Sequence, residues 1–485
     1  MGDTVVEGAT EPETLRAWVH RQIDVTLAID LRGLALMRVA LGLLVVWDVS
    51  SRWRDAAVLY SDAGFWTRAD AGRPLFLFRF YDLSGDPSWA QAGLGLTGSL
   101  ALLFVAGLLT RPVTFLLWAM LTALHLRQGW VIQGGDDLLR NFLFFGIFLP
   151  LGRRWSLDAR WRHRDLGAPP RRARGWAAVV FYVQLFLLYF LAGAMKARHL
   201  HWWQGLGIHY ALAADHFVMP WGRSIHGYSH ALRIVGLGTL LLEFLAPFLL
   251  LLGPPNKRLR VGLFAAFMSL HVGIALTLRI GLFSFVCMAL WLFALPSEWM
   301  DRIDARVGTD IHGETVAASP RWAGYLSATF MAGLLLTYTV RNIVPPGEVR
   351  RALMQPMATL RLQDKWSMFT GKREHTGWLT APAITSDGRE VDLLRGGAPL
   401  SWTRPEHPLA RYPNQRWRKL WVTMRKDRGL RATKAYVRWL CTTGPYKRVS
   451  FVYVRHAIHP PDRPLDAWFG QEGRVTVYAQ WCPAM

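Results

Sequence analysis

The sequence predicts an all-α polytopic membrane bundle of about nine transmembrane helices, followed by a C-terminal extracytoplasmic α+β domain. The first observation is a series of long apolar blocks; residues 92–110 and 176–195, for example, contain no charged side chain. Such blocks rise about 1.5 Å per residue as helices and can cross most or all of about 30 Å of hydrocarbon. The second is that arginines gather in a few of the loops between blocks. The third is that short alternating runs, typical of strands, replace the blocks after residue 345.

Residues 1–30, ahead of the first apolar block, are predicted to form a cytoplasmic amphipathic segment. The segment opens with acidic residues and has no apolar core of a signal peptide, so we expect no cleavage. Thr10 and Glu13 have the spacing of a helix capping box. The helix that follows either lies on the membrane or packs on the protein as a solvent-facing helix. Its apolar face consists of Leu15, Trp18, Val19, Ile23 and Leu27.

The predicted transmembrane domain covers residues 31–344, and its nine spans are 33–49, 90–109, 112–127, 138–151, 175–196, 232–253, 258–277, 279–297 and 322–344. Eight arginines lie between residues 153 and 174, which indicates that this loop is cytoplasmic. Counting spans outward from it places the N-terminus inside and residues 345–485 outside. The loop over residues 50–89 is also placed outside despite its arginines.

Residues 345–485 are predicted to form a small basic α+β domain. Asp387-Gly388 lies between two short strand-like runs, as in a tight hairpin turn. A helical pattern over residues 431–440 ends before Gly444-Pro445. Apolar residues alternate over 449–453 and 475–479, which indicates half-buried strands.

The chain has three cysteines, which fall in two different settings. Cys441 and Cys482 lie in the predicted external domain, where thiols can oxidise, so we expect a disulfide between them. Cys287 lies inside a predicted span and is expected to be an inert packing residue. Because no C-x-x-C motif is present, the cysteines indicate neither a redox motif nor a zinc site.

The formal net charge of +22 would indicate a nucleic-acid partner in a soluble protein. No glycine-rich phosphate loop, zinc-ligand spacing or aromatic RNA-binding motif accompanies this charge, so we expect no nucleic acid. Arginines that orient the spans or face anionic headgroups account for the charge. Membrane lipid is therefore the expected partner.

Ionisable side chains at membrane depth are costly, and they are the first candidates for a functional site. Lys196 ends the predicted span 175–196, where a lysine either extends to the headgroups or serves in catalysis. The loop after it is rich in histidine and tryptophan and includes His199 and Trp202. The i,i+2 spacing of its histidines fits neither a helical metal-binding pair nor a zincin motif, so we expect no metal.

Other ionisable residues inside predicted spans are either hydrogen-bonded packing residues or parts of a site. The candidates for a site are His125, Glu243 and His271, while the first apolar block also contains the charged residues Arg38 and Asp48. The polar turn over residues 133–137 contains Asp136 and Asp137, and Asp137 has the spacing to pair with Arg140. The third, fifth and seventh spans all end on the outer face, so these groups are predicted to surround one vestibule there.

Short stretches of the chain carry a resemblance to a known family. They include GGDDLLR at 134–140, YFLAGAMK at 189–196 and LEFLAP at 242–247, together with residues 36–42 and 149–152. These stretches resemble the HTTM family, the bacterial relatives of vitamin K-dependent gamma-carboxylase, from about residue 30 to residue 300. Residues 365–369 and 414–419 resemble the tails of bacterial members. The resemblance implies a multi-pass protein of the bacterial inner (cytoplasmic) membrane.

The resemblance also implies a reaction. In the animal carboxylase a lysine deprotonates vitamin K hydroquinone, whose oxygenation yields a strong base that removes a proton from peptidyl glutamate, and CO2 then adds. Lys196 matches the catalytic lysine, while Met195 replaces a neighbouring lysine of the animal motif. The animal enzyme's assisting histidine is absent, so Asp136 or a histidine of the 199–216 loop, such as His199, would have to replace it. Only about 140 residues replace the large substrate-binding domain, which puts carboxylation of a protein or peptide substrate in doubt.

The sequence thus predicts an enzyme that uses reduced menaquinone or vitamin K hydroquinone, with Lys196 as general base. Around the quinone we expect His125, Trp202, Glu243 and His271. Lys196 is expected to have no direct carboxylate partner, and to line an apolar pocket together with groups from the third and seventh spans. The alternative is a non-catalytic membrane scaffold or binding protein whose basic external domain docks an acidic lipid or protein. A transporter would show repeated halves with broken helices, which the sequence lacks.

Overall fold

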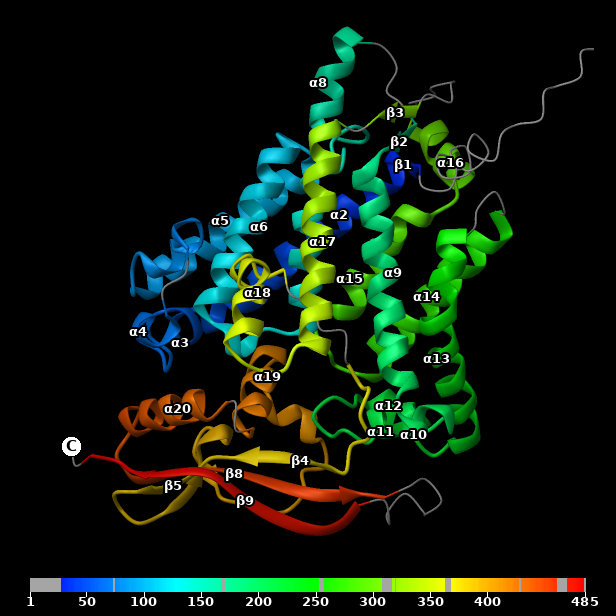
Figure 1. The fold of residues 1–485 in the computed structure, drawn as a ribbon. Coiled ribbons are helices and arrows are strands. Elements are labelled where there is room, and N and C mark those ends of the chain that lie inside the picture. The colour runs from blue at the N-terminus through cyan, green and yellow to red at the C-terminus, as the bar shows by residue number, and fades with distance from the viewer. Residues whose placement is uncertain are drawn as a thin grey trace, which may run out of the picture.

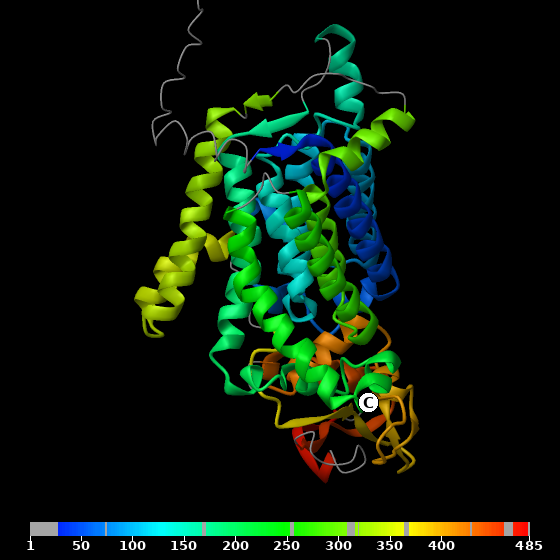
Figure 2. The same cartoon turned by 90° about the vertical axis from the view of Figure 1, so that its right-hand side faces the viewer.

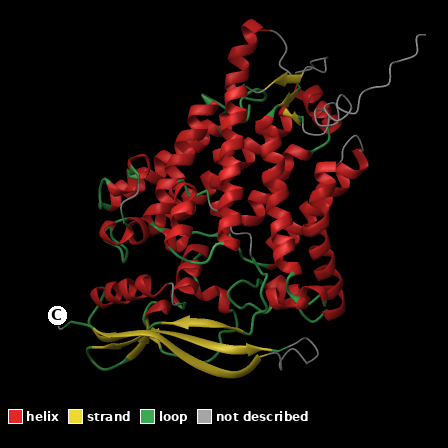
Figure 3. Cartoon of the chain, viewed as in Figure 1, coloured by secondary structure: helices red, strands yellow, loops and turns green. Residues whose placement is uncertain are grey.

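The computed structural model describes residues 28–72, 75–166, 171–252, 257–307, 316–318, 320–362, 368–426, 429–459 and 469–483. The predicted amphipathic helix near the N-terminus lies outside these residues, as do residues 365–367 of one family-like stretch. The described chain is a helical bundle with a six-stranded sheet at one of its ends and a small three-stranded sheet at the other (Figures 1 and 3).

Within the described residues a helix stands at each of the nine predicted spans (Figure 1). The bounds are α2 (Leu31–Arg52), α5 (Pro87–Ala106), α6 (Thr110–Arg127), α7 (Gly134–Gly146), α9 (Trp176–Ala197), α13 (Ser229–Leu252), α14 (Lys257–Thr277), α15 (Phe283–Trp291) and α17 (Arg321–Ile343). Local sequence explains several ends. The side chain of Asp30 caps α2, and that of Asp86 caps α5 just before Pro87. Gly107 ends α5 with a φ of 68°, a left-handed conformation that favours glycine.

Fewer helices are complete membrane spans than the nine that the sequence predicts. Six of the described helices are long and apolar enough to cross a membrane. The number is seven if the helical segments over residues 283–294 and 297–306, which meet at 87°, together form one span. The helix α7 has 13 residues, which cover only about 20 Å. Its side chains are nearly all buried in protein, so α7 needs no length that matches the lipid. Arg111, His125 and Arg127 lower the hydropathy of α6.

The two ends of the bundle carry different structures (Figures 1 and 2). At one end lie α8 (Leu157–Leu166), α16 (Ser297–Val307) and a three-stranded sheet of β1 (Ile29–Asp30), β2 (Arg172–Arg174) and β3 (Val316–Ala318). The opposite end, called the sheet end below, carries the C-terminal sheet of β4 to β9. The described parts of the loops predicted to be cytoplasmic lie at the first end. Which compartment each end faces stays a prediction.

Short α-helices and 3-10 helices lie between the long helices and after the last of them. These are α3 (Ala56–Tyr60), α4 (Arg68–Ala71), α10 (Leu200–Trp203), α11 (Gly207–Leu212), α12 (Pro220–Ile225) and α18 (Glu348–Thr359), with 3-10 helices η1 (Trp53–Asp55), η2 (Phe76–Phe78), η3 (Phe80–Asp82), η4 (Gly129–Val131), η5 (Leu292–Ala294), η6 (Leu393–Arg395) and η7 (Pro408–Arg411). The loop over residues 50–89 contacts the C-terminal region, because the indole of Trp439 donates to the carbonyl of Ala63 over 3.2 Å. This loop therefore lies at the sheet end.

The C-terminal region has the predicted α+β composition. Its central strand β8 (Tyr446–Ile458) pairs with β9 (Phe469–Trp481) on one edge, and with β4 (His375–Thr380) and β5 (Pro382–Thr385) on the other. The strands β6 (Glu390–Asp392) and β7 (Ala398–Pro399) extend the sheet beyond β5. The helices α19 (Gln415–Met424) and α20 (Leu430–Thr442) lie between this sheet and the bundle (Figure 1).

Several predictions for this region are confirmed. Asp387-Gly388 forms the turn between β5 and β6, and the φ of Gly388 is 88°. Val449 and Phe451 are buried in β8, and Tyr453 is half-buried with its ring centroid 4.6 Å from Cζ of Arg425, so the predicted half-buried strand is present. Cys441 of α20 and Cys482 after β9 form a disulfide with a Cα–Cα distance of 5.3 Å. Cys287 is a free buried thiol in α15.

A candidate ligand site in the helical bundle

Lys196, in the last turn of α9, forms a buried ion pair with Glu243 of α13. The Nζ of Lys196 donates to Oε2 of Glu243, and the two side chains are 7% and 9% exposed. Gly193 explains why these two helices approach so closely: a Cβ atom there would lie 2.6 Å from the backbone nitrogen of Phe244. The expectation that Lys196 has no carboxylate partner is therefore wrong. A buried charge without a counter-charge is costly, and Glu243 supplies that counter-charge.

Beside this ion pair lies a cavity of about 610 Å³ between α9, α13 and α14. Its lining is apolar except for a few hydroxyl groups, and Lys196 and Glu243 are its ionisable side chains. Ile234 and Val235 line the cavity and are themselves exposed on α13, so the cavity reaches the outer surface of the bundle. The predicted apolar pocket beside Lys196 is thus present. The seventh span, α14, contributes to it as expected, but the third, α6, does not; α13 does so instead.

Trp202 closes the sheet end of the cavity. The Nζ atom of Lys196 lies 5.3 Å from the centroid of its ring, within the range of a cation–π contact. The indole Nε1 of Trp202 donates to the carbonyl of Phe369 over 3.0 Å. Met368 and Phe369, from the connection between α18 and β4, also line the cavity. The C-terminal part of the chain therefore helps to enclose the site.

His271 lies behind the cavity lining rather than in it. Its Nε2 is 2.8 Å from the hydroxyl of Tyr189, which also accepts a hydrogen bond from the indole of Trp291. The hydroxyl of Tyr189 and Nε2 of His271 share one hydrogen bond, whose donor is set by the tautomer of the imidazole. The arrangement joins α9, α14 and α15, so the structure places His271 in a packing network next to the site.

His199 does not line the cavity either. It precedes α10 as the N-cap residue, and its backbone nitrogen donates to the carbonyl of Lys196 over 3.0 Å. In the same loop His209 and His226 stack with ring centroids 4.9 Å apart. Burial above all, and the neighbouring His209, lower the pKa of His226 to about 3. His226 is therefore a neutral group of the loop packing at ordinary pH.

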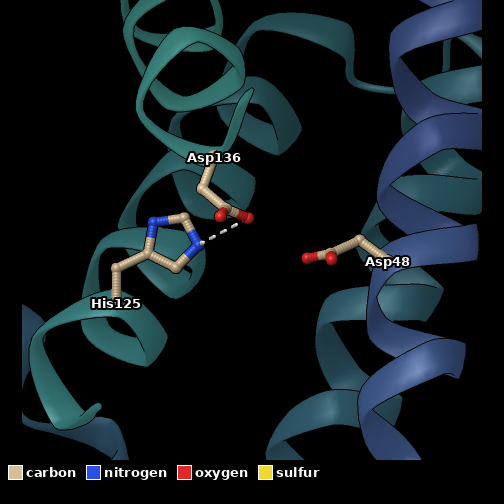
Figure 4. Close-up of side chains that lie close together, drawn as sticks. All are labelled: Asp48, His125 and Asp136. Atoms are coloured by element: carbon tan, nitrogen blue, oxygen red, sulfur yellow. Dashed lines mark ion pairs between the residues drawn. The ribbon is translucent and has the colours of Figure 1, made fainter. Parts of the chain in front are cut away.

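Asp136 and His125 belong to a second, separate network (Figure 4). Figure 4 shows them with Asp48 of α2, and a dashed line joins His125 Nε2 to Asp136 over 4.0 Å. Nδ1 of His125 lies 2.7 Å from Arg140, which also pairs with Asp137 as predicted. Neither Asp136 nor His125 lines the cavity. The predicted vestibule that would unite them with Lys196 is therefore not formed.

Two arginines neutralise the carboxylates of this second network. Arg52 donates to Asp48 over 2.8 Å and to Asp136 over 2.9 Å. Arg416, from α19, donates to both oxygens of Asp136 and also to Asp48. Asp48, His125 and Asp136 offer ligand atoms close enough together for a metal ion. Because the two guanidinium groups already occupy both carboxylates, we assign a structural role to this cluster instead.

Two features of the sequence point to this network, although its ion pairs were not predicted. Asp48 is an ionisable residue inside a predicted span, and Arg416 lies in a stretch that resembles bacterial family tails. The sequence pattern does not show that α19 contacts the helical bundle. Gln133, at the start of α7, also bonds this helix, to the carbonyl of Gln415 and to the side chain of Arg418.

Most residues that form the site lie in a part of the chain that a known protein-family model matches. A family model described as the HTTM domain matches residues 27–299. No curated protein and no solved structure matches the chain. The matched residues run from α2 through α15, and they contain Lys196, Glu243 and Trp202 as well as most of the cavity lining. Because the match covers more than half of the 485 residues, the chain belongs to the HTTM family.

Proposed function

We propose that this protein is a membrane enzyme that binds a reduced quinone, menaquinone or vitamin K hydroquinone, in the cavity beside Lys196 and promotes its oxygenation. The observation that carries the proposal is an apolar cavity of about 610 Å³ whose two ionisable side chains are bonded to each other. Coupling to carboxylation of a peptidyl glutamate is the further step that the family resemblance implies. In this proposal the sheet end faces the extracytoplasmic side of a bacterial inner membrane.

The cavity has properties that fit a quinone. Its volume of about 610 Å³ lies within the roughly 300–1,000 Å³ of small-molecule sites. Its walls are leucine, isoleucine, alanine and aromatic side chains, which suit a flat apolar ring and the start of an isoprenoid tail. The exposed side chains of Ile234 and Val235 mark the side from which a lipid-soluble molecule enters. The two ionisable groups that could bond a quinone oxygen, Lys196 and Glu243, lie together in the lining.

The Lys196–Glu243 pair supplies the proton acceptor. The amine of Lys196 and the carboxyl group of Glu243 share one proton through their hydrogen bond, and the net charge of the pair is the same whether Nζ or Oε2 holds that proton. Such a unit accepts one further proton from a hydroxyl placed next to it, whichever of its two atoms holds the first. Reduced quinones supply the redox chemistry, because their deprotonated form reacts with molecular oxygen. Glu243 therefore becomes part of the base in this proposal, in place of Asp136 and His199.

Trp202 and the Met368–Phe369 segment restrict water at the sheet end. The indole covers the Nζ side of the pair and is held by its bond to the carbonyl of Phe369. A low local dielectric strengthens the interaction between the pair and a bound hydroxyl, and it keeps reactive species away from bulk water.

The experiment is quinone-epoxide formation by the purified full-length chain in lipid nanodiscs, supplied with reduced menaquinone and air. Lys196→Ala, Lys196→Arg and Glu243→Gln should each abolish turnover, because arginine cannot lose its proton in this range and glutamine cannot accept one. Arg395→Gln, on the exposed η6 of the C-terminal region, serves as a matched control with full activity. Full activity in Lys196→Arg would remove this residue from the mechanism.

The alternative function, a non-catalytic scaffold that docks an acidic partner, makes a different prediction for the same experiment. The scaffold predicts no quinone turnover by the wild-type chain and no effect of quinone on its thermal unfolding. Reduced quinone that binds and raises the unfolding temperature only when Lys196 and Glu243 are intact would exclude it, even before turnover is detected.

A further inference from the structure

A second group of charged residues lies at the sheet end, away from the Lys196–Glu243 pair. Its centre is His216, in the loop between α11 and α12, which is 1% exposed. Neither ring nitrogen of His216 has a hydrogen-bond partner within the described residues. Buried polar atoms are nearly always bonded, so an unpartnered imidazole points to a ligand.

Arginines from two segments, the connection before β4 and the helix α19, lie near this imidazole, and a third segment adds an arginine beside them. Arg425, Arg373 and Arg418 all act on His216 electrostatically, and Arg279 lies close enough to act on Arg418. We call Arg279, Arg373, Arg418 and Arg425 the arginine cluster. Burial first, and these cations next, hold the pKa of His216 well below its ordinary value, so the ring is neutral and offers one donor and one acceptor.

The positive charge of the arginine cluster is not balanced by neighbouring carboxylates. None of Arg373, Arg418 and Arg425 forms an ion pair with Asp or Glu in the part of the chain that the structure describes. Asp215 is adjacent in sequence, but its carboxylate bonds Arg404 over 2.8 Å and Arg223 over 3.6 Å. Burial lowers the pKa of Arg418 to about 10, which leaves it charged at neutral pH. Like charges gathered in a buried place are costly unless an anion compensates them.

The guanidinium groups are oriented by aromatic rings. Cζ of Arg418 lies 4.4 Å from the ring centroid of Phe217, and Cζ of Arg373 lies 5.3 Å from the same ring. Cζ of Arg425 lies 4.6 Å from the centroid of Tyr453. A guanidinium that contacts a ring keeps the N–H groups of its plane for hydrogen bonds. Arg418 uses one of these for Gln133, over 3.0 Å, while its buried Nε has no partner within the described residues.

We propose that the arginine cluster and His216 form a binding site for a phosphate group. Several arginines that converge on one buried point suit a doubly charged anion with many acceptor oxygens better than a single carboxylate. Arg279 is exposed, and Arg373 and Arg425 are half-buried, so the group enters from that side. Phe369, whose ring lies 5.9 Å from Cζ of Arg373, also lines the cavity. The phosphate site therefore adjoins the apolar cavity, and it is proposed independently of the chemistry at Lys196.

A phosphate group can come from free inorganic phosphate or from a phospholipid headgroup, and titration calorimetry on the full-length chain distinguishes the two. One arm adds sodium phosphate to protein in dodecyl maltoside, at an ionic strength held constant with sodium chloride. The other adds phosphatidylglycerol in mixed micelles. The test variants are Arg418→Gln and the less buried Arg373→Gln, and the control is Arg395→Gln, which removes the same charge from an exposed position of the same region.

Saturable binding in either arm, weakened at least about tenfold by each test variant and unchanged in the control, supports the site. The arm that binds identifies the source of the phosphate. If Arg418→Gln does not fold, the comparison rests on Arg373→Gln. Three results overturn the proposal: no binding in either arm, equal loss in the control variant, or binding of a glutamate-rich peptide with none of phosphate.

Discussion

The close crossing of α9 and α13 at Gly193 provides a direct test of the ion-pair geometry. A Cβ atom added at Gly193 would lie 2.6 Å from the backbone nitrogen of Phe244 and 2.8 Å from the carbonyl carbon of Glu243. An ordinary contact needs at least 3.4 Å. Both neighbours are backbone atoms, so a side-chain rotation cannot relieve the clash, and the two helices must separate by roughly 0.8 Å.

This separation has two measurable consequences for Gly193→Ala. Overpacking of a well-packed contact costs about 1–3 kcal/mol, so the unfolding temperature of the protein in detergent should fall. The hydrogen bond between Lys196 and Glu243 should lengthen as well, because it bridges the same two helices within one turn of Gly193. Quinone turnover should therefore fall together with stability.

Gly262→Ala is the matched control, because Gly262 lies inside the helix α14, is not part of the cavity lining, and a Cβ atom there meets nothing within 4 Å. Alanine at the control position should leave the stability of the protein unchanged or raise it by up to about 1 kcal/mol, because alanine favours a helix more than glycine does. Both variants are compared by thermal unfolding in one detergent and by turnover in nanodiscs. A Gly193→Ala protein as stable and active as the Gly262→Ala protein would refute the close crossing and the account of the ion pair built on it.

Three further changes test the buried charges and the disulfide. Lys196→Met alone or Glu243→Leu alone should cost about 3–5 kcal/mol of stability, because each leaves an unpaired buried charge. The double variant should recover most of that loss in a thermal double-mutant cycle, and additive losses would contradict the ion pair. Arg416→Met should cost a similar amount and expose the contact between α19 and the bundle to limited proteolysis; an unchanged digestion pattern would contradict the structural role assigned to it. Replacing Cys441 and Cys482 by serine releases a 41-residue loop and should destabilise the C-terminal region by up to roughly 4 kcal/mol, whereas unaltered unfolding in reducing and oxidising buffer would show that the bond contributes nothing.

The helical part of the fold was predictable because apolar block length is a strong signal. All nine helix positions follow from the blocks, yet only six or seven of the described helices qualify as spans. The difference lies in helices such as α7, whose apolar residues face protein on every side. Composition alone cannot separate a lipid-facing helix from one buried within a bundle, because both environments are apolar. The strands β8 and β9 were recognisable because apolar residues occur at every second position along part of each strand.

The site was predictable in its residues but not in their pairing. Lys196 and Glu243 were both identified as charges at membrane depth, yet they are 47 residues apart, and periodicity does not say which faces of two helices meet. The cost of a lone buried charge favours pairing wherever opposite charges can reach each other. The same reasoning applies to Asp48 inside α2, whose partner Arg416 belongs to a region predicted to be a separate soluble domain. Treating the membrane domain and the C-terminal domain as independent concealed that contact. An intramembrane carboxylate near the end of a span therefore indicates that a cation from a neighbouring soluble domain should be sought as its partner.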